Sequence, residues 1–527
     1  MRTPAQTNQT PGGLPYKWIV VIVIIFGLFM SVLDSTIVNI AIPRLQTDFG
    51  APLSSVQWVS TGYTLAQGVA TPLTPFLSGR LGLKRFYLMA LALFTIGSAL
   101  CGISWSLSVL IFFRILQGVG GAPLLPMSFT LLYREFPPQE RGTATGILGI
   151  PILLAPALGP TIGGYIVTTI GWPLIFYLNV PIGIVGFFMG FFLLREFRPD
   201  ANTYFDLPGF VFSAIGLSAI LYALSDVSTD GWGSTTVLSL LAGGLLSLAI
   251  FVVVELMTAS DGRQPLLDIR LFANGTFTTG NIAFVLVIFS LFGGLFLVPI
   301  YLQNLRGQTA YEAGVILLPQ AFASMVAVLV GGRLVDRIGV KAVVIPGLLI
   351  LAFALWRFSF VSLQTPFSEY QLLLILRGLG LGLSAQPLTL AILSDIKPKD
   401  LSQASSINSV VRSVAGSAGV AVLSSLVQTQ TSFHYAHLAE QVTATSQAGA
   451  LLQRQIASFM AQGASLQAAT AAAVQLLIQQ LQQQANMLGI NDAFLFSLAI
   501  TVAAIVLVLL IPLRPQPKGA AKPVITE

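Results

Sequence analysis

The chain contains 527 residues, of which 55% are hydrophobic and only 9% are charged, and its mean hydropathy is +0.83. Soluble domains carry about 25% charged residues, so this composition excludes a soluble globular protein and indicates a polytopic membrane protein. The net charge of +6 could suggest nucleic-acid binding, but the positions of the basic residues decide that question. Cys101 is the single cysteine, which excludes an intrachain disulfide framework.

Long apolar segments follow one another along the chain, and runs of about 20 apolar residues predict transmembrane helices. The first run follows a polar, Pro/Gly-rich stretch without a secretory signal, so we expect it to be retained as the insertion signal. In chain order the sequence predicts fourteen spans, at roughly 18–41, 56–78, 86–104, 107–132, 142–168, 173–194, 207–225, 236–257, 277–302, 313–332, 342–362, 370–394, 403–427 and 491–512.

The basic residues follow the positive-inside rule. When both termini are placed in the cytoplasm, 19 of the 26 Lys and Arg residues fall in cytoplasmic segments and three fall outside. This asymmetry predicts a multi-pass protein of the cell (inner or cytoplasmic) membrane with both termini cytoplasmic. The basic residues then lie beside lipid headgroups, which argues against a nucleic-acid partner.

Two short basic loops resemble each other and indicate an internal repeat. FLSGRLGLKR (76–85) follows the second predicted span, and GRLVDRIGVK (332–341) follows the tenth. In each half an arginine then opens a Gly-rich helix, Arg114 in the first and Arg377 in the second. Such repeats are typical of a large transporter class. The chain is therefore predicted to contain a tail at 1–17, a six-helix bundle at 18–195, two linking helices at 207–257, a second six-helix bundle at 277–512 and a tail at 513–527.

The segment 428–490 is a long external loop, rich in Gln and Ala. Its apolar residues recur at helical spacing, which predicts a helical hairpin with one apolar stripe. The stripe either packs on the protein itself or at the headgroups, or it docks an external adaptor protein. Its members are Leu466, Ala469, Ala473, Val474, Leu477, Ile478 and Leu481.

Asp34 lies well inside the first predicted span, where a charged side chain costs about 2.5–3.5 kcal/mol on insertion scales. Arg114 is the second deep charge, and helix geometry places both residues roughly 10 Å below the external surface. A nearby arginine stabilises a carboxylate whereas burial destabilises it, so Asp34 can bind and release a proton as its surroundings change. We expect proton coupling by this pair; the alternative is a static ion pair that fixes the helices.

Six stretches together carry a resemblance to a known family. They are LDSTIVNIAIPRL, VQWVSTGYTLAQGVATPLTPFLSGRLG, FFRILQGVGGAPLLPM, GPTIGGYI, IFYLNVPIG and YLQNLRGQTAYEAGVILLP, in that order. The ordered set resembles the fourteen-span drug:proton antiporters of the major facilitator superfamily, the EmrB/QacA group. The resemblance implies an all-α major facilitator fold of two six-helix bundles plus two extra central helices. It also implies proton-coupled export of hydrophobic or cationic drugs by alternating access, with no cofactor. The alternative is a proton- or ion-coupled metabolite transporter of the same fold.

The stretch GILGIPILLAPALGPTIGG resembles the family's antiporter motif in the fifth span. Small residues spaced four apart allow two helices to touch backbone to backbone, and a proline removes a backbone hydrogen bond and bends the helix. The resemblance associates this motif with antiport; the alternative is ordinary helix packing. The motif positions are Gly146, Ala155, Gly159, Pro160, Gly163 and Gly164.

The basic loops resemble the family's signature for a latch, a set of charge contacts that holds the cytoplasmic gate shut. Gly79 replaces the usual Asp of the first copy, whereas the second copy keeps it as Asp336. We expect Asp336 with Arg337 and Arg333 to form the stronger latch. The alternative is plain positive-inside charge. The latch residues implied by the resemblance are Arg80, Arg85, Asp336, Arg337 and Lys341.

Aromatic and amide side chains suit flat, lipophilic cations, and six such residues are expected to line the substrate cavity. Other acids, among them Asp206 and Glu255, fall at helix ends where water is expected to reach them, with Glu255 as the next titratable candidate. Arg357 and Arg412 have no evident acid in their own spans. The cavity candidates are Asn39, Trp58, Tyr63, Gln67, Gln117 and Asn281.

An enzyme or a receptor is the rival class. The chain has two histidines, His434 and His437, and lacks a nucleophile–base pair and a phosphate-binding GxxxxGK[ST] stretch. We therefore expect no enzyme, no ATP-driven pump and no metal site. The expected partners are small hydrophobic or cationic drugs, protons and the lipid bilayer, with the adaptor as an open possibility.

Overall fold

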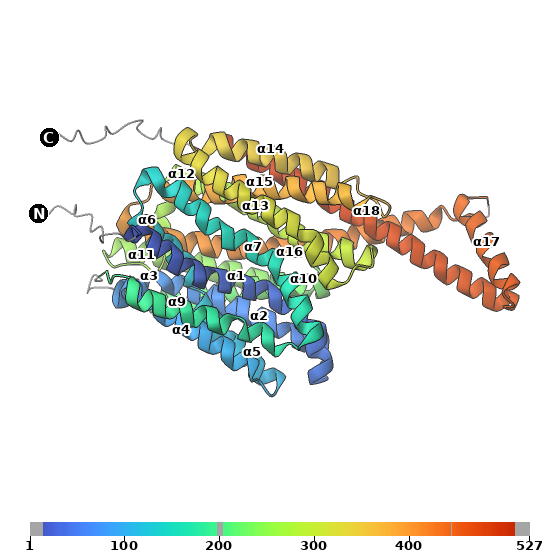
Figure 1. Ribbon diagram of the computed structural model, residues 1–527, viewed down its shortest axis with the longest axis horizontal. Coiled ribbons are helices and arrows are strands. Elements are labelled where there is room, and N and C mark those ends of the chain that lie inside the picture. The colour runs from blue at the N-terminus through green and yellow to red at the C-terminus, as the bar shows by residue number, and fades with distance from the viewer. Residues whose placement is uncertain (1–13, 198–203, 444, 512–527) are drawn as a thin grey trace, which may run out of the picture.

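The computed structural model describes residues 14–197, 204–443 and 445–511, and within these ranges the chain folds almost entirely into helices (Figure 1). The predicted C-terminal tail and most of the predicted N-terminal tail lie outside the described residues. The predicted all-α membrane fold is confirmed.

The helices before residue 198 form what we call the first half. Their order is α1 (Tyr16–Phe49), α2 (Leu53–Ala70), η1 (Thr71–Leu73), α3 (Thr74–Leu81), α4 (Leu83–Gly102), α5 (Leu107–Gly121), α6 (Leu124–Glu135), η2 (Pro138–Glu140), α7 (Arg141–Thr169), α8 (Pro173–Tyr177) and α9 (Asn179–Leu193). Two long helices follow and connect the halves, α10 (Leu207–Asp230) and α11 (Thr235–Ser260).

The second half begins after the short 3-10 helix η3 (Ile269–Ala273). It contains α12 (Gly275–Ile300), the π-helical turn η4 (Tyr301–Leu305), α13 (Ala310–Ile338), α14 (Val340–Phe358), α15 (Phe367–Ser394), η5 (Pro398–Asp400), α16 (Leu401–Glu440), α17 (Gln447–Ala461) and α18 (Leu466–Leu510).

Thirteen helical segments of the described chain are long and apolar enough to cross a membrane. The predicted second span falls outside this set, although it is helical throughout as α2, η1 and α3. Its helix α2 carries Ser60, Thr64 and Gln67, which make it less apolar than its neighbours, and it packs against α5 and α10. The helices α9 and α11, in contrast, expose large aliphatic and aromatic side chains over much of their surface, as expected for helices that face lipid.

The two halves meet along α7 and α13, which lie side by side over their whole length (Figure 1). We call the end of the molecule at which α1 begins and α18 ends the basal end, and the opposite end the distal end. At the basal end α16 also contacts α3 and α6 of the first half. On its other side α7 packs against α1, so α7 lies between the first helix of one half and the seam to the other.

The segment 428–490 is helical, as predicted, but it is not a loop separate from the spans, because its outer helices continue the spans on both sides. α16 continues to Glu440, and α18 begins at Leu466 and runs without a break into the last span. Together with α17 these extensions project from the distal end (Figure 1). Ala469, Ala473, Leu477 and Leu481 of the predicted stripe are buried, whereas Leu466, Val474 and Ile478 are exposed.

Candidate functional site

Asp34 of α1 is completely buried inside the first half and accepts three side-chain hydrogen bonds. Its Oδ2 lies 2.6 Å from Nη1 of Arg114, and its Oδ1 accepts from Nε2 of Gln117 at 2.9 Å and from Nδ2 of Asn179 at 3.0 Å. These partners come from α5 and from the first residue of α9. Because all three groups donate, the arrangement suits the ionised carboxylate.

Arg114 is held by contacts of its Nε, of its Nη1 and of the face of its guanidinium. Nε donates to the carbonyl oxygen of Val59 at 3.0 Å, and Nη1 also donates to Oε1 of Gln117 at 2.7 Å. The guanidinium carbon lies 4.1 Å from the centre of the Tyr63 ring, which is a cation–π distance. Nη2 is buried without a hydrogen-bond partner among the described residues. The site therefore retains one unused donor beside the ion pair.

The sequence predicted Asp34, Arg114 and Gln117 as functional residues but missed Asn179. Asn179 is 1% exposed and donates both to Asp34 and, at 3.3 Å, to Oγ of Ser98. The signal was an amide in the apolar stretch IFYLNVPIG, where an unpaired polar group is costly and therefore needs a partner. The sequence gives no direction for that side chain, so its partner was not evident.

The predicted cavity residues do not share one site. Tyr63 and Gln67 adjoin the Asp34 cluster, because Gln67 donates to the Tyr63 hydroxyl at 2.8 Å. Asn39 is more exposed and accepts a hydrogen bond from Ser60 at 2.8 Å. Trp58 is stacked on Tyr222 of α10, with ring centres 5.3 Å apart.

The remaining cavity candidate, Asn281, lies in the second half. It is buried in α12 and accepts from Asn408 of α16 at 3.1 Å. A separate cleft of about 390 Å³ opens between α10, α12, α16 and α18, and its lining includes Gln428, Gln482 and Asn486.

The antiporter-motif helix α7 makes unusually close contacts on both sides. A Cβ atom added to Gly146 would lie 2.7 Å from the Val328 carbonyl oxygen of α13, and one added to Gly159 would lie 2.4 Å from Oγ1 of Thr36 in α1. Gly163 likewise faces Ile37 of α1, whereas Gly164 faces Tyr311 at the start of α13. Ala155 is buried, and α7 stays helical through Pro160. Only residues this small allow α1, α7 and α13 to approach so closely.

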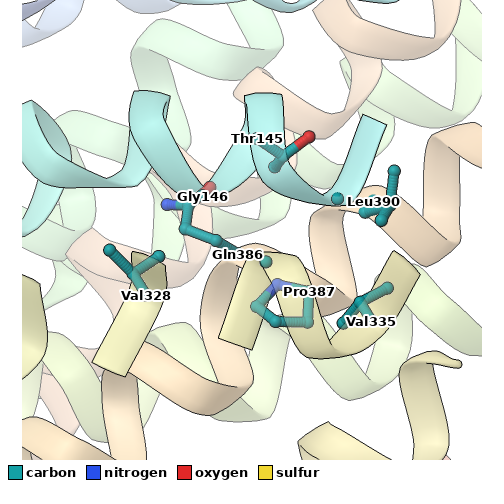
Figure 2. A pocket seen from close by; sticks show the side chains of 9 residues that line it. Thr145, Gly146, Val328, Val335, Gln386, Pro387 and Leu390 are labelled. Atoms are coloured by element: carbon teal, nitrogen blue, oxygen red, sulfur yellow. The ribbon is translucent and has the colours of Figure 1, made fainter. Parts of the chain in front are cut away.

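Figure 2 shows the basal part of this seam, where α7, α13 and α15 surround a space too narrow to hold a water molecule. The Gln386 side chain reaches from α15 toward α7, and neither its Oε1 nor its Nε2 has a hydrogen-bond partner among the described residues. The residues lining the space include Gly142 and Gly332, whose backbones approach each other at the basal end.

Asp336, one of the predicted latch residues, bridges the two halves, but not through the arginines we expected. Its Oδ1 accepts from the Gly142 amide at 2.8 Å, and its Oδ2 accepts from the amide and the hydroxyl of Thr143 at 2.8 and 2.6 Å. A carboxylate at a helix start is stabilised by the free amides and the positive end of the helix dipole. Asp336 therefore caps α7 from the other half.

The other latch candidates have different roles. Arg85 lies 3.6 Å from Glu196, and this carboxylate also caps the start of α4 within the same half. Lys341 donates to the Leu509 carbonyl oxygen at 2.8 Å, and Arg80 lies over the Phe76 ring. No contact is described for Arg337.

Ser78 precedes Gly79, the residue that replaces the usual Asp of the first loop. Its hydroxyl lies 3.0 Å from that of Ser402 in α16. A single neutral contact therefore joins the halves at this position. The two loops thus differ: the second supplies a carboxylate to the other half, and the first supplies a hydroxyl.

Two acids predicted to be water-exposed are buried, so that expectation is wrong. Asp206 is 2% exposed and caps α10, because its Oδ1 accepts from the Gly209 amide at 2.9 Å. Glu255 is 1% exposed, and one of its carboxylate oxygens accepts from the Leu267 amide at 3.4 Å. The segment after α11 that contains Leu267 covers the C-terminal end of this helix and keeps water away from Glu255. Arg357 has an acid partner after all, Glu369 at 2.7 Å in the following helix.

No cluster of three or more potential metal ligands occurs in the described part of the chain. His434 lies 2.8 Å from an oxygen of Asp492 in α18, so its side chain joins the two long helices of the projection. His437 is hydrogen-bonded to Gln441.

Long apolar helices in two packed halves, with a buried ion pair in one of them, are the features of a multi-pass membrane transporter. Residues 24–420 match the family model described as Major Facilitator Superfamily, and the chain belongs to this family. It is 32% identical over 489 residues to an uncharacterized MFS-type transporter of Bacillus subtilis, with 92% of this chain and 91% of that protein covered.

Two further relatives have names that refer to export. The chain is 33% identical over 432 residues to the tetracenomycin C resistance and export protein of Streptomyces glaucescens, with 80% of each chain covered. It is 31% identical over 427 residues to the multidrug export protein EmrB of Escherichia coli, with 80% of this chain and 83% of that protein covered. The resemblance to the drug-exporting branch of the family and the prediction of a non-enzymatic transporter are confirmed.

Among solved structures, the human organic anion transporter MFSD10 matches with a TM-score of 0.59 at 14% sequence identity. The match covers 93% of this chain and all of that one. At this identity the match supports the major facilitator fold alone.

Proposed function

We propose that this protein exports small hydrophobic or cationic compounds from the cell in exchange for protons, and that Asp34 is the coupling residue. The relatives named for multidrug export and tetracenomycin C export support the direction and the type of substrate. The observation that supports proton coupling by Asp34 is its buried carboxylate with three hydrogen-bond donors. Intramembrane acids that face such partners are functional by default.

Protonation of Asp34 would change the contacts between three helices. The protonated acid gives up one of its acceptor positions and loses its charge, so the attraction that joins α1 to Arg114 of α5 weakens. Asn179 and Gln117 then lose their charged acceptor as well. In our proposal, these changes shift the first half between a state that binds substrate and one that releases it.

The basal end is the cytoplasmic one in this proposal, because the short basic loops lie there and follow the positive-inside rule. The contacts of α16 with α3 and α6, together with Asp336 at the start of α7, then close the cytoplasmic side. Alternating access requires these contacts to open when substrate enters from the cytoplasm. Both termini and the latch thus belong to the same side of the cell membrane.

Ethidium efflux from energised cells tests the proposal. Cells with the wild-type protein, Asp34→Asn or Asp48→Asn are compared at equal membrane abundance, with and without a protonophore. Asp48 lies on the same helix and pairs at the surface with Arg44, so Asp48→Asn is a matched control. We expect protonophore-sensitive efflux from the wild type and the control and none from Asp34→Asn. Undiminished efflux in Asp34→Asn would exclude Asp34 as the coupling residue, and absent efflux in the wild type would contradict cation export.

A further inference from the structure

The two halves differ in how they treat their buried arginines. In the first half Arg114 is neutralised by Asp34. In the second half Arg377 and Arg412 are buried within the spans, and neither forms an ion pair with an acid in the described part of the chain. A buried cation without a counter-charge is strongly unfavourable, so each of these two residues requires an explanation.

Arg377 is explained by its protein contacts. Nη1 donates to Oε1 of Gln320 at 3.1 Å, and Nη2 donates to the carbonyl oxygens of Ser290 and Leu291 at 3.3 and 3.0 Å. Its side chain is 0% exposed. It is therefore inaccessible, and although its Nε lacks a hydrogen-bond partner among the described residues, both of its Nη atoms donate to oxygen atoms of the protein.

Arg412 has no comparable set of partners. Its Nε and Nη2 are buried and have no hydrogen-bond partner among the described residues. Its one described contact is with the Phe284 ring, whose centre lies 4.9 Å from the guanidinium carbon. Unlike Arg377, the residue as a whole retains 9% exposure, but its Nε and Nη2 are closed off in this state, so a ligand reaches them only when the two halves move apart.

The position of Arg412 on α16 explains what can reach it. Ser405 of the same helix contacts Thr130 of the first half at 2.9 Å, and Asn408 contacts Asn281 of α12. At about 3.6 residues per turn, Arg412 lies on the helix face between those of Ser405 and Asn408. Along the helix axis it lies roughly 10 Å further into the membrane than Ser405. It therefore lies between α12 and the interface with the first half, where a transported compound passes in alternating access.

We propose that Arg412, Phe284 and the Asn281–Asn408 pair form a subsite for the carboxylate of an aromatic compound. The inference rests on the proposed export function and adds anionic aromatic compounds to its substrates. A planar guanidinium can bind a carboxylate through two parallel N–H···O hydrogen bonds. The two atoms without partners, Nε and Nη2, are one of the donor pairs that form this bidentate arrangement. The Phe284 ring and the Asn281–Asn408 pair are buried beside the charge in this state, and in the open state of the proposed cycle they would offer the ligand an aromatic surface and neutral polar contacts.

Two probes that share a ring and a linker but differ in charge test the subsite. Pyrene-1-butyrate is anionic and pyrene-1-butylamine is cationic. Transport of each into proteoliposomes is driven by an imposed pH gradient and measured for the wild type, Arg412→Gln, Arg412→Lys and the control Arg454→Gln. Arg454 is exposed on α17, far along the chain from the site. Protein-free liposomes give the passive rate.

We expect the wild type and Arg454→Gln to transport both probes. Arg412→Gln should lose pyrene-1-butyrate transport by roughly tenfold or more, the effect of removing a charge-assisted hydrogen-bond pair, and change pyrene-1-butylamine transport by less than about twofold. Arg412→Lys keeps the charge without the fork and should fall between these values. If Arg412→Gln does not fold, the proposal is tested with Arg412→Lys, which should selectively lose transport of pyrene-1-butyrate.

Other outcomes overturn the proposal and distinguish it from the export function. A wild type that transports pyrene-1-butylamine but not pyrene-1-butyrate keeps the exporter and excludes the subsite. Equal loss of both probes in Arg412→Gln and Arg412→Lys shows that Arg412 is a packing residue on Phe284. A wild type that transports neither probe, while ethidium efflux is also absent, contradicts the export function itself.

Discussion

The carboxylate of Asp336 lies 2.8 Å from the backbone nitrogen of Gly142, although one residue ends a helix of the second half and the other begins a helix of the first. Because α7 starts with free amide groups, the Asp336 carboxylate of the second half serves as the acceptor for the amides of Gly142 and Thr143. The contact holds the two halves together at the basal end. In the alternating-access cycle that we propose, this contact breaks once in each turn of transport.

Replacing Asp336 by Asn should loosen the basal end. The amide keeps the shape but removes the charge, and hydrogen bonds to charged groups contribute about 1.5–3 kcal/mol. A reporter cysteine at Ser405, which is buried at the contact between the halves, should then react with a membrane-impermeant maleimide roughly ten times faster in inside-out vesicles. Asp261→Asn, at an exposed position at the end of α11, is the control and should leave the rate unchanged. Equal rates in Asp336→Asn and wild type exclude a latch at this position.

Gly332→Ala should separate the two halves by steric means. A Cβ atom at this position would lie 2.4 Å from the Gly142 carbonyl oxygen, and this backbone atom cannot move aside as a flexible side chain can. Overpacking of this kind costs about 1–3 kcal/mol, so thermal unfolding in detergent should occur at lower temperature and ethidium efflux should fall.

Gly243→Ala is the matched control for this glycine. No atom lies within 4 Å of a Cβ added there, and the position is in the middle of α11. The substitution should leave efflux unchanged and raise stability slightly, since alanine favours a helix over glycine by about 1 kcal/mol. If Gly332→Ala behaves like Gly243→Ala, α7 and α13 are not held together by backbone contact at that point.

The proximity of Asp34 and Arg114 could be predicted by counting residues along two helices that run in opposite directions. The partner of Asp336 could not, because the amides at a helix start belong to the backbone and have no sequence signature. Polar composition conceals the continuity of one helix. The Gln- and Ala-rich stretch predicts a helical hairpin separate from the last span, whereas α18 runs without a break from Leu466 into that span. The predicted second span is helical, although its hydroxyl residues make it weakly apolar.

Asn179 should act as a positioning residue for Asp34. Asn179→Leu removes a 3.0 Å hydrogen bond to the carboxylate, and the loss of a bond to a charged group should lower proton-driven ethidium efflux by about tenfold or more. Ser98→Ala removes the other contact of the same amide, together with a hydrogen bond to the Phe176 carbonyl oxygen, but leaves the bond to Asp34, so it should retain more than about half of the wild-type rate. In Asn179→Gln the amide can still donate a hydrogen bond to Asp34, so this variant should retain more efflux activity than Asn179→Leu. Full efflux in Asn179→Leu contradicts the positioning role.

Neighbouring residues in α18 separate two roles of the distal projection. Leu477 is 7% exposed, whereas Ile478 is 47% exposed. Leu477→Asp places an unpaired charge in the packed interface with α16 and α17, so it should destabilise the projection by about 2–3 kcal/mol and expose α17 to limited proteolysis. Ile478→Asp should leave proteolysis and efflux unchanged if the stripe only packs on its own protein. Normal proteolysis together with lost resistance in cells, for Ile478→Asp alone, supports docking of an external adaptor, because the exposed half of the stripe is then needed by a partner rather than by the fold.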